Sequence, residues 1–350
     1  MKPSREELLT DKVKHVDFDR INTVADLLEA WQDSSIQSRA LATAAQVWKD
    51  AVEDEDRPTI MLGLSGALIA GGMRKIIRDL VKHSLVDVVV SIGAIPYQDF
   101  YQARGYHHYK TVPEIDDLML REHFLDRIYD TIVDEEKFRE TDAYIGEIAE
   151  SLPPRHYSSR EFMNILGSKV DDDNSILRTA HLKGTPVFVP ALNDSSTGIG
   201  LTGYYAKMLK EGKEMMHIDP IKDNWEISQI KFKSKKTAVI YIGGGVPKNY
   251  IQQTEVIAET LGYDPGGHHY AIQIGMDPAH WGGLSGATFK EAQSWGKINR
   301  RAKMVMAHVE ATVGLSLVAG YLLQRKEIWS DRTPLRFEWD ENGNLDLRTE

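Results

Sequence analysis

The sequence contains no cysteine among its 350 residues. That absence excludes disulfides, thiolate metal sites, iron–sulfur clusters and a cysteine nucleophile. Long apolar runs are missing too, because no stretch reaches the roughly 18–20 apolar residues that a membrane span needs. The first residues, MKPSREELLTDK, contain no apolar signal core. We therefore expect a cytoplasmic protein with no membrane partner.

An excess of basic residues is also lacking. The 42 Lys and Arg residues are outnumbered by 52 Asp and Glu residues, which gives a formal net charge of −10. Since the chain has no basic stripe, we do not expect a nucleic-acid partner. Small cationic partners such as amines are compatible with this charge, although the sum alone does not select them.

The chain does contain a regular alternation of apolar strand patterns and helical patterns. The periodicity predicts strands at 59–64, 86–91, 186–189, 236–242, 270–274 and 303–309, and helices at 36–52, 68–81, 198–212, 247–261 and 311–323. Residues 113–151 are charged and are expected to be helical. Because the strand patterns are apolar on both faces, the alternation predicts an α/β fold: a Rossmann-like, doubly wound, mainly parallel sheet with helices on both faces.

No repeat or linker divides the chain, so we expect a single domain over 1–350. Within it we distinguish an N-terminal helical segment (1–57), an α/β core (58–325) and a C-terminal tail (326–350). The tail has a hairpin pattern, with Asn342 and Gly343 favouring a type I′ turn.

The ends of the predicted strands carry glycines and acids. A small-residue turn at 65–72 follows the first strand, and three consecutive glycines, 243–245, follow the fourth. Such turns let a phosphate approach backbone N–H groups, although tight helix packing explains the first turn equally well. Asp194 and Glu310 also follow strands. A carboxylate there can accept ribose hydroxyls, but capping of the next helix is the other reading.

Lys297 follows a glycine and lies two residues after Trp295. A poorly hydrated, aromatic surrounding disfavours the ammonium form and exposes a nucleophilic amine. The alternative is a solvated loop lysine. The histidine pairs at 107–108 and 268–269, and His280, lack the spacing of a helix-borne zinc site, so no metal is expected.

The Ser294-Trp295-Gly296-Lys297-Ile298 block resembles the deoxyhypusine synthase family. Further blocks from about residue 62 to residue 323 are similar in the same order, which covers most of the chain. They are Gly63-Leu64-Ser65, Leu85-Val86-Asp87-Val88-Val89-Val90, Pro186-Val187-Phe188 through Asp194, Gly243-Gly244-Gly245-Val246 and Ser285-Gly286-Ala287.

The resemblance implies a deoxyhypusine synthase-type fold, NAD as cofactor, and a homotetramer with active sites between subunits. It implies a reaction in which NAD oxidises an amine such as spermidine to an imine, a lysine captures the imine, an acceptor amine displaces that lysine, and NADH reduces the product. Lys297 matches the catalytic lysine. The matched cofactor positions are Gly66, Ala67, Leu68, Ile69, Ala70, Gly93, Ala94, Asp194, Gly244, Met276, Asp277, Glu310 and Ala311. The substrate positions are Tyr97, Gln98, Asn249, Gly282, Gly283, Leu284, Glu291 and Trp295.

The departures from the family pattern lie on the amine side. Tyr97-Gln98 replaces two glutamates, Ile199 and Leu284 each replace an acid, and Asn249 replaces a histidine. Each lost charge-assisted contact is worth about 1.5–3 kcal/mol. We therefore expect an aminoalkyl transferase for small amines, of the homospermidine synthase or agmatine-related kind, with Asp99, Glu291 and the Tyr97 ring as substitute contacts.

Two alternatives stay open. The first is a true deoxyhypusine synthase, which modifies a lysine of the hypusine-carrying translation factor. The second is a non-catalytic, NAD- or amine-binding regulatory paralogue. It is suggested by Asn249, which replaces the histidine of the family pattern.

Overall fold

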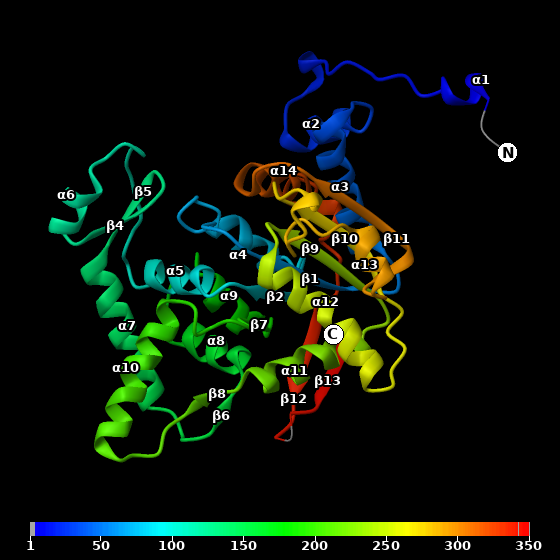
Figure 1. Cartoon of the computed structure of the whole chain (residues 1–350). Coiled ribbons are helices and arrows are strands. Elements are labelled where there is room, and N and C mark those ends of the chain that lie inside the picture. The colour runs from blue at the N-terminus through cyan, green and yellow to red at the C-terminus, as the bar shows by residue number, and fades with distance from the viewer. Residues whose placement is uncertain (1–3, 342, 350) are drawn as a thin grey trace.

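A six-stranded, fully parallel sheet forms the centre of the computed structural model, which describes residues 4–341 and 343–349 (Figure 1). Across the sheet the strand order is β11-β10-β9-β1-β2-β7. The strands are β1 (Thr59–Leu64), β2 (Val88–Ser91), β7 (Val187–Phe188), β9 (Thr237–Ile242), β10 (His268–Ile274) and β11 (Ile298–Ala307). The prediction of an α/β fold with a mainly parallel sheet is confirmed.

Helices cover both faces of this sheet, because successive strand residues point to opposite faces. Ile60, Leu62 and Leu64 of β1 pack into one apolar cluster with α3 and α14, whereas Met61 packs into another with α11, α12 and α13. The helices of the core are α2 (Val24–Trp31), α3 (Ile36–Glu53), α4 (Arg74–Lys82), α5 (Ala94–Ala103), α8 (Ser159–Ser168), α9 (Ile176–Lys183), α11 (Pro220–Lys233), α12 (Gly245–Thr260), α13 (Phe289–Ser294) and α14 (Ala311–Gln324).

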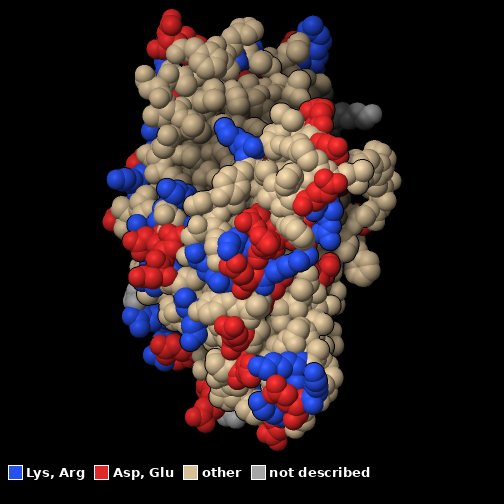
Figure 2. Space-filling model, turned by 90° about the vertical axis from the view of Figure 1, so that its left-hand side faces the viewer, with Lys and Arg blue, Asp and Glu red and all other residues tan. Residues whose placement is uncertain are grey.

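A second group of elements extends from one side of the core, at the left of Figure 1. Helices α7 (Glu135–Glu150) and α10 (Ser196–Glu211) lie side by side there. The remaining elements are α6 (Asp117–Glu122), the antiparallel strands β3 (Tyr109–Lys110), β4 (Leu125–Ile128) and β5 (Thr131–Asp134), and the parallel pair β6 (His156–Tyr157) and β8 (His217–Ile218). On this face acidic and basic side chains are interspersed (Figure 2), as in the Arg139–Glu135 and Lys207–Glu150 ion pairs.

The two ends of the chain differ from each other in packing. Residues 9–17 near the N-terminus are irregular and, apart from the half-buried Val16, exposed. They lie between α1 (Arg5–Leu8) and a 3-10 turn (Phe18–Arg20), so the expected helical segment is helical only in part. At the other end, β12 (Leu335–Trp339) and β13 (Leu345–Thr349) pair antiparallel against α11. The expected turn at Asn342 lies outside the described residues. Short 3-10 turns also occur at Ala279–Trp281 and Lys326–Ile328.

Two predicted elements are wrong in their limits. Residues 125–134, expected to be helical, form the β4–β5 hairpin. The helix expected from residue 68 begins only at Arg74. Residues 67–71 form a turn in which Gly71 N donates to Ala67 O, and Gly72, with a φ of +83°, ends this turn before the helix starts. None of the helices in the described part is long and apolar enough to cross a membrane.

Candidate active site

The carboxyl ends of five central strands lie level with one another. The pairing registers place Ser91, Leu64, Ile242, Ile274 and Ala307 side by side as direct neighbours. Ligands of open parallel sheets bind beyond this edge, at the point where the strand order reverses. Here that point lies between β1 and β9, so the loops after these two strands form the centre of the candidate site.

The loops after β1, β9 and β10 contact one another through backbone N–H groups of glycines and hydroxyl groups of serines. Ser65 Oγ accepts a hydrogen bond from Gly244 N (2.9 Å), and Gly245 N donates to Ser285 Oγ (3.0 Å). A Cβ atom on Gly244 would lie 2.6 Å from Ser285 Cα. Because no side chain fits at Gly243 or Gly244, these two glycines are required for the close approach of the loops, whereas Gly245 has open space and a φ of +60°. By contrast, a Cβ on Gly66 would have no atom within 4 Å, so the backbone there is open to a ligand.

Lys248, in the first turn of α12, is hydrogen-bonded to the end of β10 and to the loop that follows it. Its side chain is buried, and its Nζ atom donates to Gln273 Oε1 (2.7 Å), Ala287 O (2.6 Å) and Ser285 O (3.2 Å). Burial lowers the pKa of Lys248 to about 8. Sequence reasoning missed this lysine, although its position three residues after the glycine run was a usable signal.

Lys297 is held by backbone contacts at the start of β11. Gly296, with a φ of +71°, ends α13, and Lys297 N then donates to Ala292 O (3.1 Å). Lys297 O accepts from His268 N (3.1 Å) at the start of β10. The backbone of this lysine is therefore fixed by a helix end on one side and a strand on the other, while its side chain stays free to react.

The Lys297 amine is half-buried and lies 5.4 Å from the ring centre of Trp295. Burial lowers the pKa of this amine, while the negative charge of Glu291 raises it. The negative charge of Glu291 raises the pKa of Lys248, and the positive charge of Lys297 lowers it. The three charged groups therefore interact with one another near the Ser285 loop. A lysine of lowered pKa can act as a nucleophile or form an imine.

Comparisons with known proteins find one family over most of the chain. The family model described as deoxyhypusine synthase matches residues 26–322. The probable deoxyhypusine synthase 2 of Methanosarcina mazei is 44% identical over 329 residues, covering 93% of each chain. The deoxyhypusine synthase-like protein of Coxiella burnetii is 40% identical over 339 residues, covering 95% of this chain and 94% of its own.

This chain belongs to the deoxyhypusine synthase family. A solved structure from Entamoeba histolytica, assigned as a deoxyhypusine synthase, superposes with a TM-score of 0.61, covering 89% of this chain and 97% of that chain. Since the two share 18% of their residues, this likeness concerns the fold alone. The resemblance expected from the sequence is confirmed.

Most of the cofactor positions implied by the deoxyhypusine synthase resemblance follow the aligned strand ends. Their accessibility differs, however. Leu68 and Ile69 have side chains in the apolar core, so only their backbone is available to a ligand. Gly93 is buried against Ser195, where an added Cβ would lie 2.4 Å from the serine Cβ. The exposed members of the set are Gly66, Ala67, Asp194, Met276, Asp277 and Glu310, and the half-buried ones are Ala70, Ala94 and Ala311.

Glu310 has a partner already. Its Oε2 atom accepts from Thr312 N (2.9 Å) and Val313 N (3.1 Å), which caps α14. Burial raises the pKa of Glu310, but the hydrogen bonds from Thr312 outweigh this and hold the pKa below its usual range. The capping reading of this residue is therefore correct, and any cofactor contact would use its second oxygen.

The substrate positions divide into a buried and an exposed set. Tyr97 and Gln98 are buried in α5, and the Tyr97 hydroxyl donates to Phe138 O (3.0 Å), so neither side chain lies on an open surface. Asn249 is half-buried. The exposed set, close to Lys297 in the sequence, is Gly282, Gly283, Leu284, Glu291 and Trp295.

Asp99 does not have the role expected of it. Its carboxylate pairs with Arg74 (2.6 Å) and accepts from Ser175 Oγ, Ile176 N and Leu177 N, which caps α9. A buried carboxylate with all these partners has no acceptor left for an amine, so the expectation of a substitute substrate contact is wrong. Within the described part of the chain, no group of three His, Asp or Glu residues is placed to hold a metal ion.

Proposed function

We propose that this chain is an NAD-dependent aminoalkyl transferase that carries its substrate as an imine on Lys297. The observation that carries the proposal is the lowered pKa of the Lys297 amine beside Trp295, in a chain of the deoxyhypusine synthase family. An amine must be uncharged to attack an imine carbon, and a lysine of ordinary pKa is almost fully charged at neutral pH.

The sheet supports NAD as the cofactor. Counted along the chain, its strand order is 3-2-1-4-5-6, which is the order of Rossmann-like dinucleotide-binding sheets. The open backbone at Gly66 lies at the reversal point and fits a pyrophosphate, whereas the N–H groups of Gly244 and Gly245 at the start of α12 are hydrogen-bonded to Ser65 and Ser285. Asp194 and Glu310 would accept ribose hydroxyls. NAD, when bound, would supply the hydride acceptor that oxidises an amine and the donor that reduces the product.

The residues of this chain would then carry the group between two amines. The uncharged Nζ of Lys297 attacks the carbon of the substrate imine, and the original amine leaves with the proton that Lys297 loses. The acceptor amine attacks the carbon of the lysine imine in turn, and the C–N bond to Lys297 breaks. Trp295 would exclude water, which otherwise hydrolyses the imine.

The positions that would hold spermidine in the deoxyhypusine reaction have lost their acids, which favours a different pair of amine substrates. Apolar Ile199 and Leu284 are exposed, and Tyr97 and Gln98 are buried, so these positions offer no carboxylate to a polyamine. Glu291 is the acid nearest to Lys297 in the sequence. We therefore favour products of the homospermidine or aminoalkyl-agmatine type.

The active site would be completed by a second copy of the chain in a homotetramer. Trp281 and Trp295 are 71% and 64% exposed, and Met276 is 61% exposed, although all three flank the proposed site. Aromatic side chains this open are costly in a site that must exclude water, and a neighbouring subunit would cover them.

The test is chemical trapping. The protein is incubated with NAD and a panel of di- and triamines, reduced with borohydride and digested, and the Lys297 peptide is weighed by mass spectrometry. We expect an aminoalkyl adduct on Lys297 and none in Lys297→Arg, which keeps the charge. If no amine gives an adduct while NAD binds, the proposal is wrong.

A second candidate is a true deoxyhypusine synthase. It is favoured by the names of the archaeal relatives, among them the M. mazei protein at 44% identity. Adding the precursor of the hypusine-carrying translation factor together with spermidine decides between the two. Transfer of an aminobutyl group to that factor would support the second candidate, and transfer to free amines alone would support the first.

A further inference from the structure

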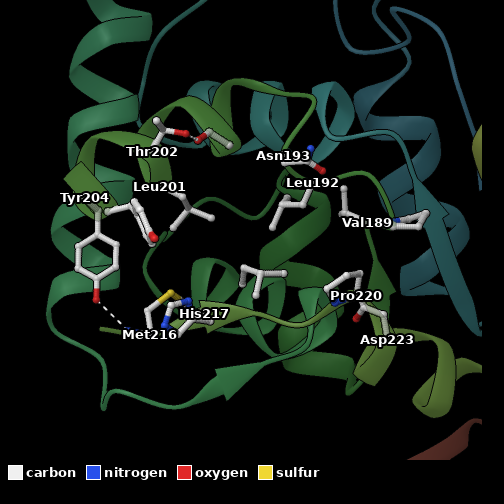
Figure 3. A pocket seen from close by; sticks show the side chains of 14 residues that line it. Val189, Leu192, Asn193, Leu201, Thr202, Tyr204, Met216, His217, Pro220 and Asp223 are labelled. Carbon is white, nitrogen blue, oxygen red and sulfur yellow. Dashed lines mark hydrogen bonds between the residues drawn. The ribbon is translucent and has the colours of Figure 1, made fainter. Parts of the chain in front are cut away.

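A cavity of about 500 Å³ lies beside β7, between α10, β8 and the first turn of α11 (Figure 3). Strands β7 and β11 are the opposite edges of the six-stranded sheet. Five strand spacings of ~4.8 Å separate them by roughly 24 Å. Since Lys297 precedes β11, the cavity is remote from Lys297 of the same chain, although Asn193 and Gly198 in its lining adjoin Asp194 and Ile199 in the sequence.

The walls of this cavity are mainly apolar. Figure 3 shows side chains from the segment after β7, from α10 and from β8 arranged around a central space. The hydroxyl of Tyr204 accepts a hydrogen bond from Met216 N (2.9 Å), which joins α10 to the β8 side of the cavity. The size falls within the ~300–1,000 Å³ of typical small-molecule sites. The principal apolar contacts come from Val189, Leu192, Leu201, Tyr204, Met216 and Ile218.

One buried carboxylate interrupts these apolar walls. Asp223 is 1% exposed, and its Oδ1 atom accepts from Ser159 N (2.8 Å). Glu226, one turn further along α11, is paired through both oxygens with Arg160 (2.7 and 3.0 Å). Within the described residues no Lys, Arg or His pairs with Asp223, and the basic side chain that lines the cavity is His217. Of these two buried acids, Glu226 is paired with an arginine and Asp223 is not.

This imbalance favours a cationic ligand. A carboxylate that is buried without a counter-ion is costly, and burial together with the charge of Glu226 raises the pKa of Asp223 to about 7. An ammonium group beside Asp223 would supply the missing positive charge. A single carboxylate cannot satisfy a polyamine, and apolar walls disfavour sugars and anions.

We propose that this cavity binds a primary monoamine with an apolar body, whose ammonium group pairs with Asp223 while its body lies between Leu201 and the Tyr204 ring. The aromatic ring adds a favourable face for such a body. The proposal does not depend on the reaction at Lys297.

Calorimetric titration of the full chain with phenethylamine tests the proposal, with 2-phenylethanol as the uncharged probe. We expect saturable binding of the amine, at least tenfold tighter than binding of the alcohol. In Asp223→Asn, whose amide oxygen can still accept from Ser159 N, affinity for the amine should fall at least tenfold. In Lys297→Ala it should be unchanged.

A second pair of variants decides the matter if Asp223→Asn does not fold. Leu201→Trp fills the cavity and should abolish binding, whereas Lys210→Trp, on the same helix but outside the lining, should preserve it. The proposal is overturned by any of three results: no saturable binding to the native chain, equal affinity for the alcohol, or loss of binding in Lys297→Ala.

Discussion

At Lys297 two effects of opposite sign act on one amine. Burial lowers its pKa and the Glu291 carboxylate raises it. Removing the carboxylate in Glu291→Gln should therefore lower the pKa further and increase the uncharged fraction at a given pH. We expect the pH profile of imine formation to move to lower pH. The measurement is the rate at which propanal and cyanoborohydride label Lys297, followed by mass spectrometry from pH 6 to pH 10.

The matched control for this change is Glu147→Gln, an exposed carboxylate on α7. Its profile should coincide with that of the native chain. A profile that moves to higher pH in Glu291→Gln, or moves equally in the control, would show that Glu291 does not act on Lys297 directly.

Glu310 combines two roles that a pair of substitutions separates. Its Oε2 atom caps α14, and its other oxygen is the one proposed for a ribose hydroxyl. Glu310→Gln keeps a capping acceptor but loses the charge, so we expect NAD affinity to fall about fivefold with little change in melting temperature. Glu310→Ala loses the cap as well and should cost about 1 kcal/mol of unfolding free energy. Unchanged NAD affinity in Glu310→Gln would leave only the capping role.

Single residues were predictable where local sequence sets their surroundings. Lys297 stands between Trp295 and a strand, and the resemblance identified it. Asp99 and Lys248 could not be placed in this way, since their partners lie 25 or more residues away in the chain. The sequence suggests Tyr97 as a substrate contact, because nothing near it in the sequence reveals that Phe138 O accepts a hydrogen bond from its hydroxyl.

At the scale of elements, the glycine turn between β9 and α12 should be sensitive to any added side chain. In Gly244→Ala the new methyl group would lie 2.6 Å from Ser285 Cα, so the Ser285 loop must move. Crowding of this kind costs about 1–3 kcal/mol. We expect NAD affinity, measured by calorimetry, to fall at least tenfold because the proposed pyrophosphate site is displaced.

Gly212→Ala is the control for that change. Gly212 ends α10 with a φ of +63° and has open space around it, so alanine there is strained by about 1–2 kcal/mol without any clash. Its stability should fall by a similar amount while NAD binding is preserved. Equal loss of NAD affinity in both variants would point to general destabilisation.

The elements of the central sheet were predicted better than the outer ones. Buried strands such as β1 and β9 are almost continuously apolar after their first residue, and tertiary contacts reinforce that local preference. The hairpin of β4 and β5 has only four residues in each strand, and its charged residues resemble those of the neighbouring helices. A period-two pattern of that length cannot be distinguished from a helix by sequence alone.

At the scale of the whole molecule, the order of the strands is what assembles the site. Periodicity shows that strands exist but does not show which of them are neighbours. The register that aligns Leu64, Ile242 and Ile274 arises from packing of both sheet faces. The resemblance is sufficient to match the cofactor positions one by one. That most of these positions lie along the same edge of the sheet follows only from the fold.

Assembly is the remaining property at this scale, and Trp281 provides its test. This side chain is 71% exposed beside the proposed site, so a neighbouring subunit should bury it. Trp281→Ser removes a large apolar contact, and we expect light scattering to show dissociation into smaller species at micromolar concentration. Trapping on Lys297 should decline in parallel, because the opened site admits water.

Tyr129→Ser, at an equally exposed aromatic residue after β4, should change neither result. Dissociation without loss of trapping would mean that each chain holds a complete site.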